Sequence, residues 1–191
     1  MPLRAVLFDL YGTLAYVEDP MSDERASEFL VKHGYEVYPQ AWRAAWQYVS
    51  FIDYPRFGYR TWEEDLKAVF RELGLRPDGK TLKGLVRLYK GVRWGLHPDA
   101  KNAILRAKKL RLKTAIVTTI AKFRYRKALK PVFKSIDLIA DGYTFHCEKS
   151  NPKIYLKTLE ALRVEAYEAV MIGDDVALDI LLPKMIGIRA I

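Results

Sequence analysis

The sequence predicts an α/β protein with a Rossmann-like parallel sheet, helices on both faces of that sheet, and an inserted all-helical cap. From residue 97 onward, short apolar runs of strand length alternate with segments of helical periodicity, which is typical of a parallel sheet. Between the first apolar run, Ala5–Phe8, and this region the periodicity is helical only. We therefore expect an α/β core formed by residues 1–15 and 95–191, and a helical cap formed by residues 16–94.

The first predicted strand, Ala5–Phe8, is an unbroken apolar run, as expected for a strand that is buried on both faces. It ends at Asp9, which is followed by Tyr11-Gly12-Thr13. Ligands of open α/β sheets bind at the carboxyl ends of the strands, and Gly12 allows a tight turn close to a substrate. Asp9 is therefore a candidate site residue, although an ordinary Asp-containing turn explains this stretch equally well.

The remaining elements follow from periodicity and from capping residues. For the cap we predict four helices with no strand between them: one beginning near Ser22, one beginning near Pro39, one after the capping box Thr61–Glu64 that continues to Gly74, and one from Lys80 to Val92. For the core we predict helices over 98–110, 123–129, 152–162 and from 176 to about 186, and strands over 114–117, 136–140, 169–172 and 188–191.

The composition is that of a soluble protein of a reducing compartment. Half of the 191 residues are apolar, which is enough to bury a core, and Cys147 is the single cysteine, so no disulfide framework is expected. No apolar stretch has the length of a membrane-spanning helix or of a signal-peptide core, so we expect a cytoplasmic protein with no membrane partner. The scarcity of Asn and Gln beside 29% charged residues is similar to proteins selected for heat resistance.

The net charge of +9 is unevenly distributed, because residues 101–134 hold twelve Lys or Arg and no acidic residue. Such a block can steer an anionic substrate or bind a polyanion. Phe123, Tyr125 and Phe133 interleave with it, as stacking platforms for nucleic acid would, although core packing explains these rings equally well. We favour the solvated face of two helices, so nucleic acid is not the expected partner.

Polar residues follow three of the predicted strands. They are Asp9 to Thr13 after the first strand, Thr118 after the second, and Gly173-Asp174-Asp175 with Asp179 after 169–172. Lys149 precedes the helix start at Asn151-Pro152. Because the carboxyl ends of parallel strands share one edge of the sheet, we expect a carboxylate, a hydroxyl, an ammonium group and an acidic cluster to converge there.

In this order and spacing, the motifs resemble those of the haloacid dehalogenase superfamily. The family's first motif, D-x-[D/Y]-G-T, is matched by residues 9–13, and the Ser or Thr that ends its second motif is matched by Thr118. The Lys of its third motif is matched by Lys149, and its fourth motif, G-D-x-x-x-x-D, is matched by residues 173–179. The resemblance covers the whole chain, because the family also inserts a helical cap between its first two motifs.

The resemblance implies that Asp9 is a nucleophile whose covalent intermediate is later cleaved by water. Thr118 would hydrogen-bond a phosphoryl oxygen, and Lys149 would orient Asp9 and offset negative charge. The candidate catalytic residues are Asp9, Tyr11, Thr13, Thr118 and Lys149, with Thr119 as a substrate-binding residue. The candidate ligands of a Mg²⁺ cofactor are Asp9, the backbone carbonyl of Tyr11, and Asp174, together with Asp175 or Asp179 through bound water.

Two features bear on the choice of reaction. Family phosphatases usually carry a second Asp, which protonates the leaving oxygen, where this chain has Tyr11, and a phenol that ionises at about pH 10 is a poor substitute. The 2-haloacid dehalogenases carry Tyr there and also resemble Ala41-Trp42-Arg43, where a cap Arg holds the departing halide. They need no metal, however, and have Ser and Asn where this chain has Gly173-Asp174-Asp175. Carboxylates clustered beside Asp9 repel one another unless a cation is bound.

We therefore predict a hydrolase that acts as a Mg²⁺-dependent phosphatase on a small anionic, phosphorylated substrate. The alternative is a metal-independent 2-haloacid dehalogenase, in which Arg43 would bind the halide. A second alternative is a non-catalytic protein that binds nucleic acid or another polyanion through the basic block. The natural substrate and the oligomeric state are not predicted.

Overall fold

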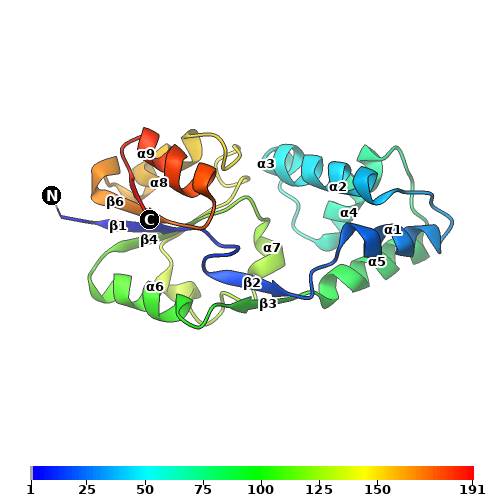
Figure 1. Cartoon of the computed structure of the whole chain (residues 1–191), viewed down its shortest axis with the longest axis horizontal. Coiled ribbons are helices and arrows are strands. Elements are labelled where there is room, and N and C mark those ends of the chain that lie inside the picture. Colours follow the sequence, from blue (N-terminus) through cyan, green and yellow to red (C-terminus); the bar gives the residue numbers. More distant parts are fainter. Residues whose placement is uncertain (1) are drawn as a thin grey trace.

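The computed structural model describes residues 2–191, which form two parts lying end to end along the longest axis of the molecule (Figure 1). One part holds a five-stranded parallel sheet, and the other holds helices α1 to α5. A two-stranded ribbon, β2–β3, runs between them. This is the predicted α/β architecture with an inserted helical cap.

The sheet has the strand order β5-β4-β1-β6-β7, and every neighbouring pair is parallel. The strands are β1 (Ala5–Phe8), β4 (Lys113–Val117), β5 (Leu138–Ala140), β6 (Ala169–Ile172) and β7 (Arg189–Ala190). β1 is the central strand and all four of its residues are buried, which confirms the expectation drawn from its unbroken apolar run.

Helices cover both faces of the sheet (Figure 1). Ala5 and Leu7 of β1 belong to a hydrophobic cluster that includes residues of α8 (Lys153–Leu162). Val6 and Phe8 point to the other face, into a cluster that includes residues of α6 (Ala100–Lys109). This alternation follows from the period of two residues along a strand, and it explains why the strand must be apolar throughout.

The four predicted helices of the cap are present and have their own hydrophobic cluster, which includes Trp42 and Phe70. They are α1 (Asp23–Val31), α2 (Pro39–Tyr48), α4 (Trp62–Glu72) and α5 (Gly79–Gly91). Thr61 caps α4 by accepting a hydrogen bond from the backbone N–H of Glu64, as predicted. The carboxylate of Glu64 accepts from the backbone N–H of Arg60 instead of closing a reciprocal box with Thr61.

Two strands were missed by the sequence prediction. β2 (Ala15–Glu18) and β3 (Arg93–Leu96) pair antiparallel at the two points where the chain passes between core and cap. Each has only four residues, and the partner of each lies beyond the whole cap in sequence, so no local pattern reveals the pairing. The expectation of helical structure alone from residue 16 to residue 94 is therefore wrong at both ends. The separate cluster of the cap supports a division close to residues 15 and 95, whose exact boundaries stay a prediction.

Other elements differ in length or type from the prediction. After α2 the chain continues as a π-helical turn (Val49–Asp53) and α3 (Tyr54–Phe57), which were not predicted. The basic helix is a single turn, α7 (Lys122–Tyr125), and the last helical segment is a π-helical stretch (Val176–Leu181) followed by α9 (Leu182–Met185). Periodicity of 3.6 residues does not separate an α-helix from these wider or shorter turns.

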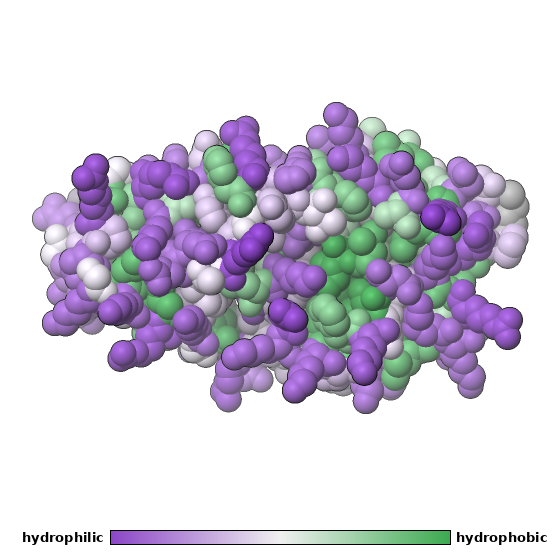
Figure 2. Space-filling view, turned by 180° about the vertical axis from the view of Figure 1, so that it is seen from behind, coloured by the Kyte–Doolittle hydropathy of each residue, from purple (hydrophilic) through white to green (hydrophobic). Residues whose placement is uncertain are grey.

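Hydrophilic side chains dominate the face shown in Figure 2, and hydrophobic residues gather near its middle. The hydrophilic character of this surface agrees with the high share of charged residues in the sequence. Within residues 2–191, none of the helices combines the length and the apolar character that crossing a membrane requires.

Candidate active site

The register of the three central strands, β4, β1 and β6, brings the residues that follow each strand to one edge of the sheet. Phe8, the last residue of β1, is aligned with Ile116 of β4 and with Ile172 of β6. Asp9 and Thr118, and the loop of Gly173 and Asp174, therefore start from neighbouring strand ends.

Two glycines allow the loops at this edge to approach each other closely. Gly12 has a φ of +91°, and a Cβ atom on it would overlap the carboxylate of Asp174. A Cβ atom on Gly173 would likewise overlap the side chain of Asp179. A larger residue at either position would displace a carboxylate, so the two glycines are required by the close packing of the acidic groups.

Three carboxylates form a compact cluster at this edge. Asp9, Asp174 and Asp179 each offer an oxygen atom, and these atoms lie within 4.8 Å of one another. Asp9 and Asp179 are buried, whereas Asp174 is exposed. Asp175 is not part of the cluster, because its Oδ1 accepts hydrogen bonds from the backbone N–H groups of Ala177 and Leu178. The structure thus places Asp175 as a helix cap beside the site.

Lys149 connects two of these carboxylates. Its buried ammonium group donates a hydrogen bond to Oδ1 of Asp9 and lies 2.8 Å from Oδ1 of Asp179. Burial raises the pKa of Asp9 to about 6, although the charge and hydrogen bond of Lys149 act in the opposite direction. The ammonium group therefore offsets part of the cost of burying the carboxylates and holds Asp9 in one orientation.

Two hydroxyl groups stand beside the cluster. Thr13 donates a hydrogen bond of 3.3 Å from Oγ1 to Oδ1 of Asp174. Oγ1 of the buried Thr118 accepts a hydrogen bond from the backbone N–H of Ile120. Accepting this bond leaves the hydroxyl hydrogen of Thr118 available for donation to an anionic oxygen at the edge of the sheet.

Tyr11 and Thr119 line a cavity of about 390 Å³ between cap and core. Tyr11 is 50% exposed, and its ring makes an edge contact with Trp94 at a centroid distance of 5.9 Å. Arg43 is not among the described residues that line this cavity. Its guanidinium forms an ion pair of 2.6 Å with Asp23, a cap residue that does line the cavity. Arg43 therefore lies one contact away from the cavity, and its ion-pair partners, Asp23 and Glu24, are not predicted site residues.

Arg124 is a residue that the sequence did not single out and that joins core and cap. It leaves α7 of the core and forms a 2.5 Å ion pair with Asp65 of α4, and both side chains are buried. Its guanidinium also lies over the ring of Trp46, 4.5 Å from the centroid. A second contact between the two parts is the hydrogen bond of 2.8 Å that the hydroxyl of Tyr54 donates to Asp141.

Replacing Arg124 by Met is expected to lower the free energy of unfolding by roughly 3–5 kcal/mol, because the buried carboxylate of Asp65 loses its counter-charge. Burial already raises the pKa of Asp65, which shows how unfavourable the charged form is there. The double variant Arg124→Met with Asp65→Leu should recover part of the loss. Urea unfolding measures both values, and Arg126→Met, an exposed neighbour, is the control. A loss in Arg124→Met no larger than in Arg126→Met would contradict the importance of this pair.

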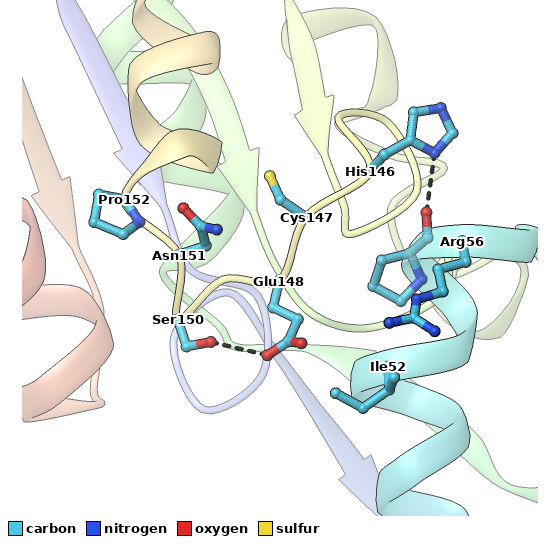
Figure 3. A pocket seen from close by; sticks show the side chains of 9 residues that line it. Ile52, Arg56, His146, Cys147, Glu148, Ser150, Asn151 and Pro152 are labelled. Atoms are coloured by element: carbon cyan, nitrogen blue, oxygen red, sulfur yellow. Dashed lines mark hydrogen bonds between the residues drawn. The ribbon is translucent and has the colours of Figure 1, made fainter.

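A second cavity, of about 510 Å³, lies between the cap and the loop that carries Lys149. Figure 3 shows Ile52 and Arg56 of the cap facing the segment 146–152 across it. His146 Nδ1 lies 3.0 Å from the backbone carbonyl of Pro55, so this loop also contacts the cap directly. None of the predicted site residues lines this second cavity, so we assign it no part in the reaction.

Three cationic residues of the basic block make local contacts within the protein. Lys108 pairs with Asp137, Lys113 donates to the backbone carbonyl of Leu162, and Arg124 is buried against Asp65. Tyr125 is fully buried, so it packs in the core and offers no stacking surface. These contacts agree with the interpretation that the block is mainly a set of solvated or locally paired residues.

Comparison with known proteins supports a family assignment. Residues 3–187 match the family model described as haloacid dehalogenase-like hydrolase. Glyceraldehyde 3-phosphate phosphatase of Pyrococcus furiosus is 26% identical over 99% of this chain and 80% of its own length. A haloacid dehalogenase-type phosphatase from Thermococcus onnurineus is 26% identical, with a TM-score of 0.65 over 98% of this chain and 85% of that one.

A dehalogenase shares the fold as well. The L-2-haloacid dehalogenase of Xanthobacter autotrophicus has a TM-score of 0.59 at 23% identity, over 98% of this chain and 76% of that one. At this identity the likeness concerns the fold alone. Because the family model spans nearly all of the sequence, the chain belongs to the haloacid dehalogenase-like hydrolases.

Proposed function

We propose that this hydrolase is a Mg²⁺-dependent phosphatase that acts on a small phosphorylated substrate, with Asp9 as nucleophile. The observation that carries the proposal is the carboxylate cluster of Asp9, Asp174 and Asp179 next to Lys149. The names of the relatives from Pyrococcus furiosus and Thermococcus onnurineus, both phosphatases, support it.

The residues present suit a magnesium ion. Carboxylate oxygens are the ligands that Mg²⁺ prefers, and three of them lie within 4.8 Å of one another at the end of β1 and β6. Among residues 2–191, a single ammonium group, that of Lys149, forms ion pairs with Asp9 and Asp179, so a negative charge remains for a cation to neutralise. Asp9, Asp174 and the backbone carbonyl of Tyr11 would hold the ion, and Asp179 would act through bound water. The ion would neutralise charge on the transferring phosphoryl group.

In the proposed reaction, a carboxylate oxygen of Asp9 attacks the phosphorus atom and forms an aspartyl phosphate. The bond from phosphorus to the leaving oxygen breaks, and the electron pair stays on that oxygen, which takes a proton from solvent. Thr118 donates its hydroxyl hydrogen to a phosphoryl oxygen, while Lys149 keeps Asp9 in position. Water then adds to phosphorus, the bond to Asp9 breaks, and phosphate is released with the carboxylate restored.

The dehalogenase alternative has Tyr11 in its favour, since this residue type is typical of 2-haloacid dehalogenases. Two features of the structure weigh against it. Arg43, the candidate halide ligand, is paired with Asp23 and does not line the cavity beside Tyr11. The clustered carboxylates would also repel one another in a metal-independent reaction, whereas a bound cation would relieve this repulsion.

Binding of Mg²⁺ is expected to raise the melting temperature of the wild type. At a Mg²⁺ concentration of about 100 times Kd the gain is roughly 2.7 kcal/mol, which corresponds to roughly 5–10 °C for a chain of this size. Asp174→Asn should show a smaller shift and should need more Mg²⁺ for activity, whereas Asp99→Asn, which removes a charge elsewhere on the core, should behave like the wild type.

The same proteins should be assayed with acetyl phosphate, with and without EDTA, and for halide release from 2-chloropropionate. Hydrolysis of acetyl phosphate that EDTA abolishes is the expected result. Halide release that is insensitive to EDTA and lost in Arg43→Ala would replace the proposal by the dehalogenase alternative. Strong retention of RNA that falls steeply with salt, without hydrolysis, would favour the polyanion-binding alternative.

A further inference from the structure

The cavity beside Tyr11 has six aromatic side chains among its described lining residues. It lies between cap and core and has a volume of about 390 Å³, within the range of sites that hold small organic molecules. Residues of the cap, the β2–β3 ribbon and the core contribute to it. Its aromatic lining residues are Tyr11, Trp46, Phe51, Trp62, Tyr89 and Trp94.

This cavity is adjacent to the candidate catalytic groups. Tyr11 follows Asp9 by two residues, and Thr119 follows Thr118 directly, and both Tyr11 and Thr119 line the cavity. A phosphoryl group held between Asp9 and Thr118 would therefore lie next to the residues that border the cavity. The cavity is thus placed to receive the leaving group of the substrate.

Several rings of the aromatic wall pack against one another and against Arg124. The rings of Trp46 and Tyr89 are stacked, with centroids 4.9 Å apart and planes inclined by 15°. Arg124, which is held by its ion pair with Asp65, lies over the ring of Trp46. Trp62 stacks against Trp46 with ring centroids 6.3 Å apart. Rings fixed in this way lose little freedom when a flat ligand stacks on them, which favours binding.

The charged lining residues of the cavity, Asp23 and Arg124, are already paired with Arg43 and Asp65. Away from the catalytic edge, the uncharged polar groups of the lining are the side chains of Gln47 and Ser50, the hydroxyl of Tyr89 and the indole N–H groups of the tryptophans. The hydroxyl of Tyr89 already accepts a hydrogen bond from Trp42. A flat ring can pack against the aromatic faces without requiring hydrogen bonds from these groups.

We infer that the substrate is a phosphate compound whose leaving group carries a flat aromatic ring, and that this ring binds between the aromatic walls of the cavity beside Tyr11. The inference rests on the proposed phosphatase function and names the substrate class for that site. Phe51 and Trp94 are the specificity-determining residues, and they act by stacking on the ring.

The test compares benzoyl phosphate with cyclohexanecarbonyl phosphate. Both release a carboxylate from a six-membered ring of similar size, and benzoate is the more stable of the two anions. The wild type should hydrolyse benzoyl phosphate with a kcat/KM at least roughly tenfold higher, which is the scale of stacking contributions. Because the stability of the two anions is the same for every variant, Phe51→Leu and Trp94→Leu should lower this ratio through the loss of stacking alone. Phe57→Leu makes the same change on an exposed cap residue outside the cavity and should leave the ratio unchanged.

A binding measurement checks the inference without turnover. Benzylphosphonate, which cannot be hydrolysed, should alter the tryptophan fluorescence of the wild type at a lower concentration than cyclohexylmethylphosphonate, and Phe51→Leu should reduce this difference. Hydrolysis of acetyl phosphate with equal rates for the two ring compounds, or a ratio unchanged in Phe51→Leu and Trp94→Leu, would overturn the inference alone. Failure to hydrolyse acetyl phosphate would overturn the proposed function and the inference with it.

Discussion

Asp9→Asn is expected to abolish turnover, with a fall in kcat of roughly 10³-fold or more, as loss of the nucleophile causes in other hydrolases. The carboxamide keeps the size of the side chain but cannot attack phosphorus or carbon. The prediction therefore holds for the phosphatase and for the dehalogenase alternative. Release of phosphate from acetyl phosphate, and of chloride from 2-chloropropionate, measures it.

The fold should persist in this variant. Oδ1 of Asp9 accepts a hydrogen bond from Lys149, and the oxygen of Asn can accept the same bond. Burial also raises the pKa of Asp9, so the folded state does not depend on a strongly favoured charge at this position. The melting temperature should stay close to that of the wild type. An active Asp9→Asn protein would exclude both enzymatic mechanisms together.

Tyr11→Asp is expected to accelerate the hydrolysis of alkyl phosphates by up to roughly 10²–10⁴-fold, the range that a positioned general acid supplies. In the wild type no carboxyl group occupies this position, so the leaving oxygen departs without a well-matched proton donor. Acyl and aryl phosphates, whose leaving groups are stable anions, should therefore be hydrolysed much faster than glycerol phosphate. Tyr11 is half exposed and borders the cavity, so a carboxyl group there could donate its proton to the leaving oxygen.

The measurement is kcat/KM for phosphate esters of graded leaving-group pKa. The series should include ring-free compounds, because the loss of Tyr11 also removes one aromatic wall. Tyr11→Asn is the matched control, since it shortens the side chain equally but supplies no acid. If the dependence on leaving-group pKa is the same in Tyr11→Asp, Tyr11→Asn and the wild type, another residue protonates the leaving oxygen and the missing Asp is irrelevant.

Much of the fold was accessible from local patterns. The unbroken apolar run Ala5–Phe8 predicted a doubly covered strand, and the structure confirms it as the central strand of the sheet. Ser22 and Thr61 predicted helix starts, and both accept capping hydrogen bonds. These features depend on neighbours within a few residues of one another, which is the range over which a sequence pattern is informative.

The ribbon β2–β3 and the π-helical turns were not accessible in this way. Ala15 pairs with Leu96, so the two strands are visible only when the whole cap is placed between them. The π-helical stretch after Asp175 has the apolar spacing of an ordinary helix. The wider π-helical turn coincides with two contacts at the start of the stretch. The side chain of Asp175 accepts a hydrogen bond from the backbone N–H of Ala177, and the backbone N–H of Asp175 donates a hydrogen bond to the side chain of Asp179.

For the candidate site as well, some features were predictable from the sequence and others were not. The order and spacing of Asp9, Thr118, Lys149 and Asp174 determined the family and the edge of the sheet at which these residues meet, because strand ends in a parallel sheet must coincide. Only the tertiary structure decided that Asp179 joins the cluster while Asp175 caps a helix, and that Arg43 lies outside the cavity. It also decided that Arg124 and three tryptophans border the cavity, because that cavity forms only where cap and core, distant in sequence, pack against each other.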